Sequence, residues 1–228
     1  MDPGTIARIE HITGTRVTGH GPLSGGCVGR VYRVRLADGR SVVAKVGIRG
    51  SGLDIVGYML RFLGRLGVRP VPEVLDEGDD FLLMTCIEAG DDLNAEAQAH
   101  AAELLAALHA TTADHYGLER DTLIGGLVQP NTPSANWVEF FREHRLLYMA
   151  REAARAGRMP ERLLSRITQF AARLETYLDN GGPPALIHGD MWAGNILVRK
   201  GRIASFIDPA IYYADAEIEL AFSTLFPT

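Results

Sequence analysis

The first 90 residues of the chain alternate between short apolar runs and turn-forming residues, a pattern that predicts mostly strands. Arg30–Leu36 and Ser41–Val46 carry β-branched residues and flank Asp38-Gly39, which is a strong hairpin signal. Apolar residues then recur at helical spacing over Leu53–Leu66. The dense apolar run Phe81–Ile87 is expected to form a buried strand.

The pattern changes after Gly90, where helical spacing dominates. An alanine-rich helix is predicted around Ala97–Leu108, with Asp92 or Asn94 as its N-cap. Residues 118–135 contain two adjacent glycines and two prolines and are expected to form a loop. Further helices are expected at 137–156, 160–178 and 214–225, and short strands at 185–187, 196–198 and 203–207.

Together these segments predict an α+β fold with two lobes. A small antiparallel sheet would form an N-lobe over residues 1–88, and a mostly helical C-lobe would cover residues 89–228. The hinge between them is expected near Thr85–Gly90. Because a cleft between two lobes is a common place for a nucleotide to bind, we expect the chemistry in loops that face this cleft.

The composition is that of an ordinary globular enzyme. The 228 residues are 46% apolar and 22% charged, and the net charge of −5 predicts neither a nucleic-acid partner nor an anionic-membrane partner. No apolar run reaches the roughly 18 residues that a membrane-spanning helix needs, and no secretory signal is expected. The two cysteines, Cys27 and Cys86, form no disulfide framework, so a cytoplasmic protein is expected.

One lysine is notable because the chain otherwise uses arginine. Of the 23 basic residues only Lys45 and Lys200 are lysine, and Lys45 lies in the predicted strand Ser41–Val46. The glycine-rich segment Gly21–Arg30 precedes this strand pair, and its backbone N–H groups could hold phosphate oxygens. Lys45 would then contact the phosphates of a nucleotide. Taken alone, each feature has a simpler interpretation, a hairpin loop and a solvent-exposed lysine.

The most informative chemical pattern is a set of polar residues around a predicted hairpin near the end of the chain. Asp190 and Asn195 lie five residues apart, and Asp208 follows thirteen residues later. Phosphoryl transfer from a nucleotide requires a base carboxylate, an amide ligand and a metal-binding carboxylate. Asp190 is therefore predicted to be the catalytic base, with Asn195 and Asp208 as Mg²⁺ ligands. Singly they could be turn or cap residues, but the three together favour a site.

Two neighbouring residues are expected to have structural roles. His188 should hold the loop before Asp190 by packing and hydrogen bonding. Asp215 should cap the last helix and help to hold the same loop. Neither residue is predicted to take part in the chemistry.

The layout of Asp190, Asn195 and Asp208 is similar to the catalytic and metal-binding loops of protein-kinase-like phosphotransferases. Longer stretches of sequence point to one family among these kinases. They lie at 116–125, 129–133, 136–146, 188–195 and 207–215. With these blocks the chain resembles the fructosamine kinase (ketosamine 3-kinase) family, a branch of the aminoglycoside-phosphotransferase-like kinases. A general aminoglycoside or choline kinase would share the three polar residues but not the blocks at 129–133 and 136–146.

The resemblance implies ATP and Mg²⁺ as cofactors and assigns further residues to the site. The nucleotide phosphates would contact Ser24, Gly25, Gly26, Cys27 and Lys45. The adenine edge would meet the backbone of Met84, Thr85, Cys86 and Ile87. Trp192 would stack on a sugar face and Arg145 would border the substrate.

The same resemblance implies an ATP-dependent kinase that phosphorylates the C3 hydroxyl of a ketosamine. Ketosamines are the adducts that reducing sugars form with amines, so the partner would be a small-molecule ketosamine or a glycated amine. The phosphorylated adduct is labile and releases the amine, which makes the expected role deglycation repair. Two alternatives stay open: another small-molecule phosphotransferase, acting on an aminoglycoside, choline or a homoserine-like alcohol, and a nucleotide-binding pseudokinase.

Three features depart from the family pattern or add to it. Val56 occupies the position of the helix glutamate that pairs with the strand lysine, and Asp54 lies about 200° away around a helix. The lysine–glutamate pair would be absent unless that helix began late, which leaves open a weak or inactive enzyme.

The C-lobe is expected to be truncated at Thr228, so that apolar residues of the last helix would be exposed and favour a homodimer. Cys27 is either a small loop residue or an oxidisable thiol in the phosphate loop.

Overall fold

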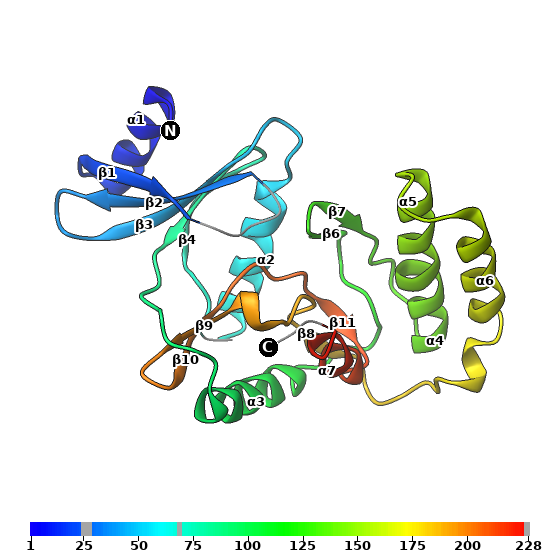
Figure 1. The fold of residues 1–228 in the computed structure, drawn as a ribbon. Coiled ribbons are helices and arrows are strands. Elements are labelled where there is room, and N and C mark those ends of the chain that lie inside the picture. The colour runs from blue at the N-terminus through cyan, green and yellow to red at the C-terminus, as the bar shows by residue number, and fades with distance from the viewer. Residues whose placement is uncertain (24–28, 68–69, 226–228) are drawn as a thin grey trace.

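The computed structural model of the chain describes residues 1–23, 29–67 and 70–225. Its N-terminal part is a five-stranded antiparallel sheet with the strand order β1-β2-β3-β5-β4 (Figure 1). The strands are β1 (Val17–Pro22), β2 (Arg30–Leu36), β3 (Ser41–Val46), β4 (Val74–Gly78) and β5 (Phe81–Thr85). Helix α1 (Pro3–Thr13) precedes β1, and helix α2 (Leu53–Arg65) follows β3.

Side-chain alternation along β3 divides the sheet between two apolar cores. Val42 and Ala44 belong to a core that includes Ile9 of α1. Val43 packs with the larger core on the opposite face, which includes α2 and continues into the C-terminal part. Because side chains on a strand alternate between faces, Lys45 shares its face with Val43 and points toward α2 and the C-terminal part.

The connection from the sheet to the C-terminal part has no regular secondary structure over residues 86–94. The Gly90 N–H donates to Val198 O at 3.1 Å, which joins this connection to the C-terminal part. Helix α3 (Ala95–His109) follows, and Asn94 caps it by accepting from the Ala97 N–H at 3.0 Å. The expected N-cap and the expected helix are both confirmed.

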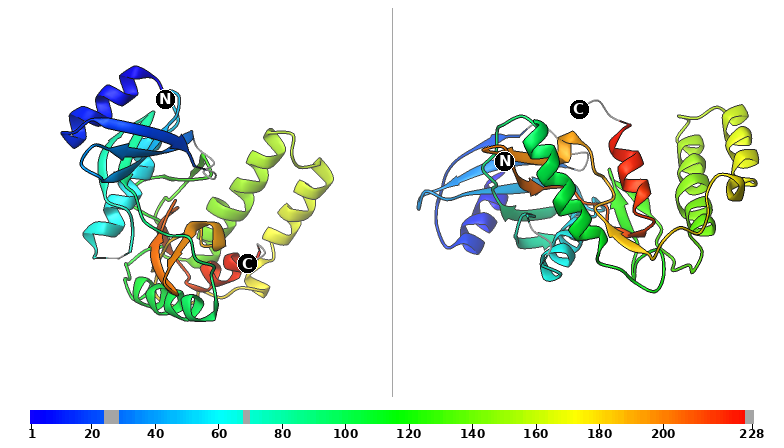
Figure 2. Two further views of the ribbon diagram at one scale, coloured as in Figure 1. Left: turned by 60° about the vertical axis from the view of Figure 1, so that its left-hand side comes forward. Right: turned by 90° about the horizontal axis from the view of Figure 1, so that it is seen from below.

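Three two-stranded sheets follow, two of them packed against α3 and the third, through β6, against α2. They pair β6 (Thr122–Ile124) with β7 (Leu127–Gln129), β8 (Ala185–Ile187) with β11 (Tyr212–Ala214), and β9 (Ile196–Arg199) with β10 (Arg202–Phe206). The chain between β7 and β8 forms a separate helical layer, visible as a pair of columns away from the sheet in both turned views (Figure 2). It contains α4 (Trp137–Phe140), a π-helical stretch (Phe141–Leu147), α5 (Tyr148–Arg155) and α6 (Glu161–Ala171). The last helix is α7 (Glu217–Ser223).

The predicted hairpin at β2 and β3 is confirmed to the residue, but several elements differ from expectation. Helix α1 and strands β1, β4 and β11 were not individually predicted, and the expected loop at 118–135 contains the β6–β7 hairpin. The expected helix at 160–178 ends at Ala171, and the last helix begins at Glu217 rather than at 214 because β11 occupies the residues before it.

The surface of α7 and the residues after it carry apolar side chains, as expected. Leu220 is 54% exposed and Leu225 is 71% exposed. The homodimer inferred from such exposure stays a prediction. Among the helices described, none is both long and apolar enough to cross a membrane.

Candidate active site

Two loops of the C-terminal part are joined by backbone hydrogen bonds, and this pairing brings the predicted chemistry together. One loop, residues 188–195, follows β8, and the other follows β10. The Ala210 N–H donates to His188 O at 2.8 Å, and the Ile207 N–H donates to Asn195 O at 3.0 Å. Asp190, within the first loop, and Asp208, within the second, are therefore held on adjacent backbone.

Asp208 connects this loop pair to the N-terminal sheet. Its Oδ1 forms an ion pair with Lys45 Nζ, and the two side chains are 26% and 6% exposed. The Asp208 backbone has φ of 52°, in the left-handed region that costs a non-glycine residue energy. This strain is consistent with a loop shaped to place a carboxylate opposite the lysine ammonium.

Two hydrogen bonds from its side-chain amide nitrogen hold Asn195 against Asp190. Asn195 Nδ2 donates to Asp190 O and to Asp190 Oδ2, each at 2.8 Å. Because the amide nitrogen is used in this way, the carbonyl oxygen of the same buried side chain is directed elsewhere. Asn195 thus fixes the Asp190 carboxylate, and its Oδ1 stays a predicted ligand for a cation.

The charges of the site are set mainly by burial. Burial raises the pKa of the Asp190 carboxyl above its ordinary value, and the nearby Asp208 charge adds to the effect. The Asn195 hydrogen bond opposes this shift in the pKa of Asp190. Burial also lowers the pKa of His188, so its imidazole is neutral at pH 7. A carboxylate beside a neutral imidazole can act as a proton acceptor.

A cavity of about 330 Å³ gathers the predicted residues from both parts of the chain. Lys45 lies in its lining together with Asp190, Trp192, Asn195 and Asp208. Five residues predicted from the sequence to form a site thus share one hollow. An ammonium, two carboxylates and an amide oxygen around one space suit the binding of a metal-bound polyphosphate.

Several other residues of the lining were not predicted from the sequence. Ile124, Gly125 and Gly126 come from the β6–β7 hairpin, and Phe222 comes from α7. Both glycines of the hairpin turn have positive φ, 54° and 83°, as a two-residue turn of this kind requires. The adjacent glycines between two short apolar runs were the signal for this hairpin.

Trp192 lies in the cavity wall and is held by a close approach to Gly194. A Cβ added at Gly194 would lie 2.3 Å from the Trp192 ring. The indole therefore folds over the backbone of its own loop, and a residue larger than glycine at 194 would displace it. A flat apolar surface so close to Asp190 suits the face of a sugar.

Arg145 is not in this cavity and is bound to the protein on several sides. Its guanidinium donates to Pro130 O at 2.7 Å and to Asn131 Oδ1 at 2.6 Å. It also lies 3.8 Å from the centre of the Tyr212 ring. Arg145 lines a second, more apolar hollow that Gly189 also borders. The predicted substrate contact stays a prediction, while these contacts indicate that Arg145 braces the wall beside the site.

The residues predicted to meet the adenine edge do not line this cavity. Met84, Thr85, Cys86 and Ile87 are at the end of β5 and just beyond it, outside the 330 Å³ cavity. Burial raises the pKa of the Cys86 thiol. Ser24, Gly25, Gly26 and Cys27 lie outside the described residues, so the predicted contacts of this segment stay predictions.

The structure shows what replaces the family's helix glutamate, which would pair with Lys45. Val56 occupies its position. Helix α2 begins at Leu53, with Asp54 in its first turn, so the helix does not begin late. Val56 is 7% exposed and faces the same cavity as Lys45. Within residues 1–23, 29–67 and 70–225, the ion pair of Lys45 is with Asp208 and none is made with Asp54.

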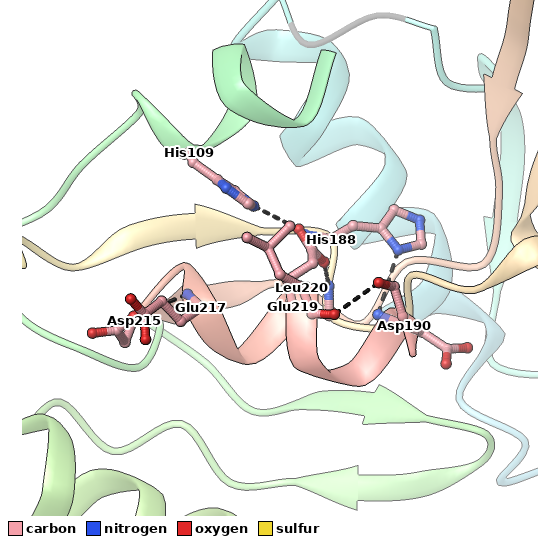
Figure 3. A network of polar contacts seen from close by, with 9 residues as sticks. His109, His188, Asp190, Asp215, Glu217, Glu219 and Leu220 are labelled. Carbon is pink, nitrogen blue, oxygen red and sulfur yellow. Dashed lines mark hydrogen bonds and ion pairs between the residues drawn. The ribbon is translucent and has the colours of Figure 1, made fainter. Parts of the chain in front are cut away.

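One structural role predicted from the sequence is wrong in part. Asp215 accepts a hydrogen bond from the Glu217 N–H at 2.9 Å beside the start of α7, but the N-cap residue of this helix is Ala216 (Figure 3). The backbone of the 188–195 loop is instead held by Glu219, which accepts from the Gly189 N–H at 2.7 Å. His188 is buried as expected, and its Nδ1 accepts from the Asp190 N–H at 3.4 Å.

The family model and the curated relatives agree on the family to which the chain is similar. The family model described as fructosamine kinase matches residues 1–228. A probable ketoamine kinase of Synechocystis is 34% identical over 162 residues, which cover 69% of this chain and 52% of that protein. A chloroplastic protein-ribulosamine 3-kinase of Arabidopsis thaliana is 28% identical, covering 92% of this chain and 66% of its own.

A solved structure agrees with these relatives. A protein from Thermobifida fusca, provisionally described as a fructosamine-3-kinase, superposes with a TM-score of 0.86 at 31% identity. The match covers 99% of this chain and 80% of that one. The chain therefore spans only about half of the cyanobacterial relative and about two thirds of the plant relative.

Proposed function

The chain belongs to the fructosamine kinase family, and we propose that it transfers the γ-phosphoryl group of ATP to a sugar hydroxyl of a ketosamine. The observation that carries this proposal is the shared cavity of Lys45, Asp190, Asn195 and Asp208. Two of these residues could meet by chance, but one ammonium, two carboxylates and one amide on three different segments are suited to phosphoryl transfer.

The nucleotide side of the site would be formed by Lys45 and the two oxygen ligands. Lys45 would bind phosphate oxygens of ATP in place of its present partner, Asp208. Asn195 Oδ1 and a carboxylate oxygen of Asp208 would hold Mg²⁺, which neutralises charge on the phosphates when it is bound. The oxygen-only character of these two groups fits this hard cation rather than a softer metal.

Asp190 would act on the acceptor. Its carboxylate would take the proton of the sugar hydroxyl as that oxygen bonds to the γ-phosphorus. The bond from the γ-phosphorus to the oxygen bridging the β-phosphate would break at the same time, and ADP would leave. The Asn195 amide would keep the carboxylate aimed at the acceptor through its bond to Asp190 Oδ2.

The substrate class is proposed from the relatives and from the wall of the cavity. The relatives are named for ketoamines and for ribulosamines attached to protein. The Trp192 ring offers a face for stacking on the sugar of such an adduct. Phosphorylation at the C3 hydroxyl would make the adduct labile and release the amine, which corresponds to deglycation repair.

A specific observation favours one second candidate, a protein that binds nucleotide with little turnover. Val56 brings an apolar side chain where a carboxylate could hold Lys45, and Lys45 is paired with Asp208 instead. In that state the lysine and the proposed metal ligand neutralise each other. If the pair did not separate when ATP bound, Lys45 would not contact the phosphates and Asp208 would not hold Mg²⁺, so the γ-phosphoryl group of an ATP held by other contacts would not be transferred.

A coupled assay of ADP release separates these functions. The acceptors are fructosyl-, ribulosyl- and erythrulosyl-lysine, with an aminoglycoside and choline as acceptors of other classes. The proposal expects acceptor-dependent ADP release with at least one ketosamine and phosphate attached to its sugar. Turnover on the aminoglycoside or choline alone, or ATP binding with no turnover on any acceptor, would contradict it.

A further inference from the structure

A buried polar network is bonded to the chain that follows Asp208. Its members come from the β6–β7 hairpin, from the segment after it and from the π-helical stretch, and they are Thr122, Gln129, Asn131 and Arg145. Each of these four residues is at most 7% exposed. Residues 129–133 carry part of the resemblance to the fructosamine kinases, but the proposed reaction leaves them without a role.

The direction of the hydrogen bonds in this network is set from one end. A guanidinium can only donate, and Arg145 Nη2 donates to Asn131 Oδ1 at 2.6 Å. The amide nitrogen of Asn131 therefore faces the other way, where it donates to Thr122 Oγ1 at 2.9 Å and to Arg120 O at 3.1 Å. With Asn131 turned in this way, the Thr122 hydroxyl has to accept.

At its other end the network terminates on backbone carbonyls just beyond Asp208. Gln129 Nε2 donates to Thr122 Oγ1 and to Ala210 O, each at 3.0 Å. Thr122 Oγ1 thus accepts two hydrogen bonds, and its own hydrogen is left for Ile211 O at 3.4 Å. Because a hydroxyl offers one donor and two acceptor positions, Thr122 uses its full capacity.

These carbonyls are near enough along the chain to set the direction of Asp208. Pro209 separates Asp208 from Ala210, and its ring fixes φ, so little rotational freedom lies between them. Asp208 has φ of 52°, and such backbone persists only where the surrounding contacts hold it. The N–H groups of Ile207 and Ala210 bond to the loop that follows β8, and Gln129 binds the Ala210 carbonyl.

The network is sensitive to the loss of any member because its groups are shielded from solvent. Without the Thr122 hydroxyl, the amides of Gln129 and Asn131 would each keep an N–H that has lost its acceptor, which costs free energy. The hairpin and the loop of Asp208 would then shift relative to each other in order to satisfy these groups. Because the turn of the same hairpin lines the cavity, the shift would take place at the site itself.

We propose that Gln129 and Thr122 are positioning residues for phosphoryl transfer, which fix the direction of Asp208 through the backbone carbonyls beyond it. Arg145 sets the direction of their hydrogen bonds through Asn131. The inference rests on the proposed function, because it assigns these residues a part in the same reaction. It predicts that their loss changes the Mg²⁺ requirement as well as the rate, since Asp208 is the proposed charged ligand.

The first test compares Thr122→Val with Thr122→Ser. Valine has nearly the shape of threonine but no hydroxyl, whereas serine keeps the hydroxyl. Thr122→Val should lower kcat by about tenfold and raise the Mg²⁺ concentration for half-maximal rate by about three- to tenfold, as loss of a contact behind a metal ligand does. Thr122→Ser should retain most of kcat and the Mg²⁺ requirement of the unmodified chain. Equal losses in the two variants would overturn the role of Thr122.

The second test compares Gln129→Met with Gln98→Met. Methionine keeps the length of glutamine but cannot donate, and Gln98 is an exposed residue of α3 whose Nε2 donates to Leu93 O at 3.1 Å. Gln129→Met should lower kcat by about tenfold and raise the Mg²⁺ requirement, and Gln98→Met should change neither. Because the Thr122 hydroxyl remains in Gln129→Met, this pair decides the question if Thr122→Val does not fold. Equal kcat values for the two variants would overturn the role of Gln129.

A third measurement separates this inference from the proposed function. Hydrogen exchange is followed without nucleotide, Mg²⁺ or acceptor, and the amides of residues 207 and 210 should exchange faster in Gln129→Met than in Gln98→Met. The amides of β2 and β3 should exchange at equal rates in the two variants. If the unmodified chain phosphorylates no ketosamine, the proposed function fails while this measurement still tests the hold on the Asp208 loop. Unchanged exchange at residues 207 and 210, or an equal increase in β2 and β3, would overturn the inference.

Discussion

Lys45 and Asp208 form a partly buried ion pair between residues that lie 163 positions apart in the chain. Lys45 comes from the N-terminal sheet and Asp208 from a strained loop of the C-terminal part. The pair therefore spans the two parts of the structure at the cavity that also contains Asp190 and Asn195. A ligand that carries both negative phosphates and a cation would replace each partner of this pair with one of its own groups.

Removal of the Lys45 ammonium should weaken phosphoryl transfer more than it weakens the fold. Lys45→Met keeps the apolar stem and is expected to lower kcat/KM for ATP by about 10²- to 10³-fold, the usual loss when one group that stabilises charge is removed. The matched control is Lys200→Met, a change of the only other lysine, which is exposed at the turn between β9 and β10. Steady-state kinetics with varied ATP measure both variants, and equal values for the two would contradict the role of Lys45.

A carboxylate at position 56 should compete with Asp208 for Lys45. Val56→Glu places an acid in the cavity that Lys45 lines, and Val56→Gln provides the same size without the charge. We expect Val56→Glu to exceed Val56→Gln in kcat by about threefold, which corresponds to an ion-pair contribution of about 0.7 kcal/mol. If the two variants show the same kcat, then the apolar residue at 56 does not limit turnover.

Two glycines of α2 should respond in opposite directions to alanine. A Cβ at Gly57 would lie 2.1 Å from Glu77 Oε2 and 3.0 Å from Glu77 Cβ, whereas a Cβ at Gly64 meets no atom within 4 Å. Gly57→Ala should reduce the free energy of unfolding by about 1–3 kcal/mol, because the side chain of Glu77 must move. Gly64→Ala should increase the same free energy by about 0.5–1 kcal/mol, through helix propensity. Urea unfolding measures both, and a stable Gly57→Ala variant would contradict the close packing of α2 on β4.

Much of the fold could be predicted where local signals were sufficient. The hairpin at β2 and β3 follows from Asp38-Gly39 and two β-branched runs, and its bounds were predicted to the residue. The start of α3 follows from Asn94, whose side chain makes the expected capping bond. The missed helix α1 also had a local signal, since Asp2 caps it and Pro3 occupies its first turn.

Other features depend on contacts between distant residues and have no local signal. Strand β4 is short and is stabilised by pairing with β5 and by packing of α2 on it. Glu219 looks like an ordinary helix residue in the sequence, and its role appears only when α7 is placed beside His188 and Gly189. The spacing of Asp190, Asn195 and Asp208 did predict that they share one cavity, because a short hairpin is enough to bring them together.

The most direct test of the account is a single-turnover measurement on Asp190→Asn with fructosyl-lysine and ATP. Asparagine keeps the size of the side chain but removes the proton acceptor, so formation of phosphorylated fructosyl-lysine should slow by about 10²- to 10⁴-fold. The affinity for ATP, measured by equilibrium binding without acceptor, should be retained. A variant that forms the phosphorylated product at the rate of the unmodified chain would contradict the assignment of Asp190 as the base.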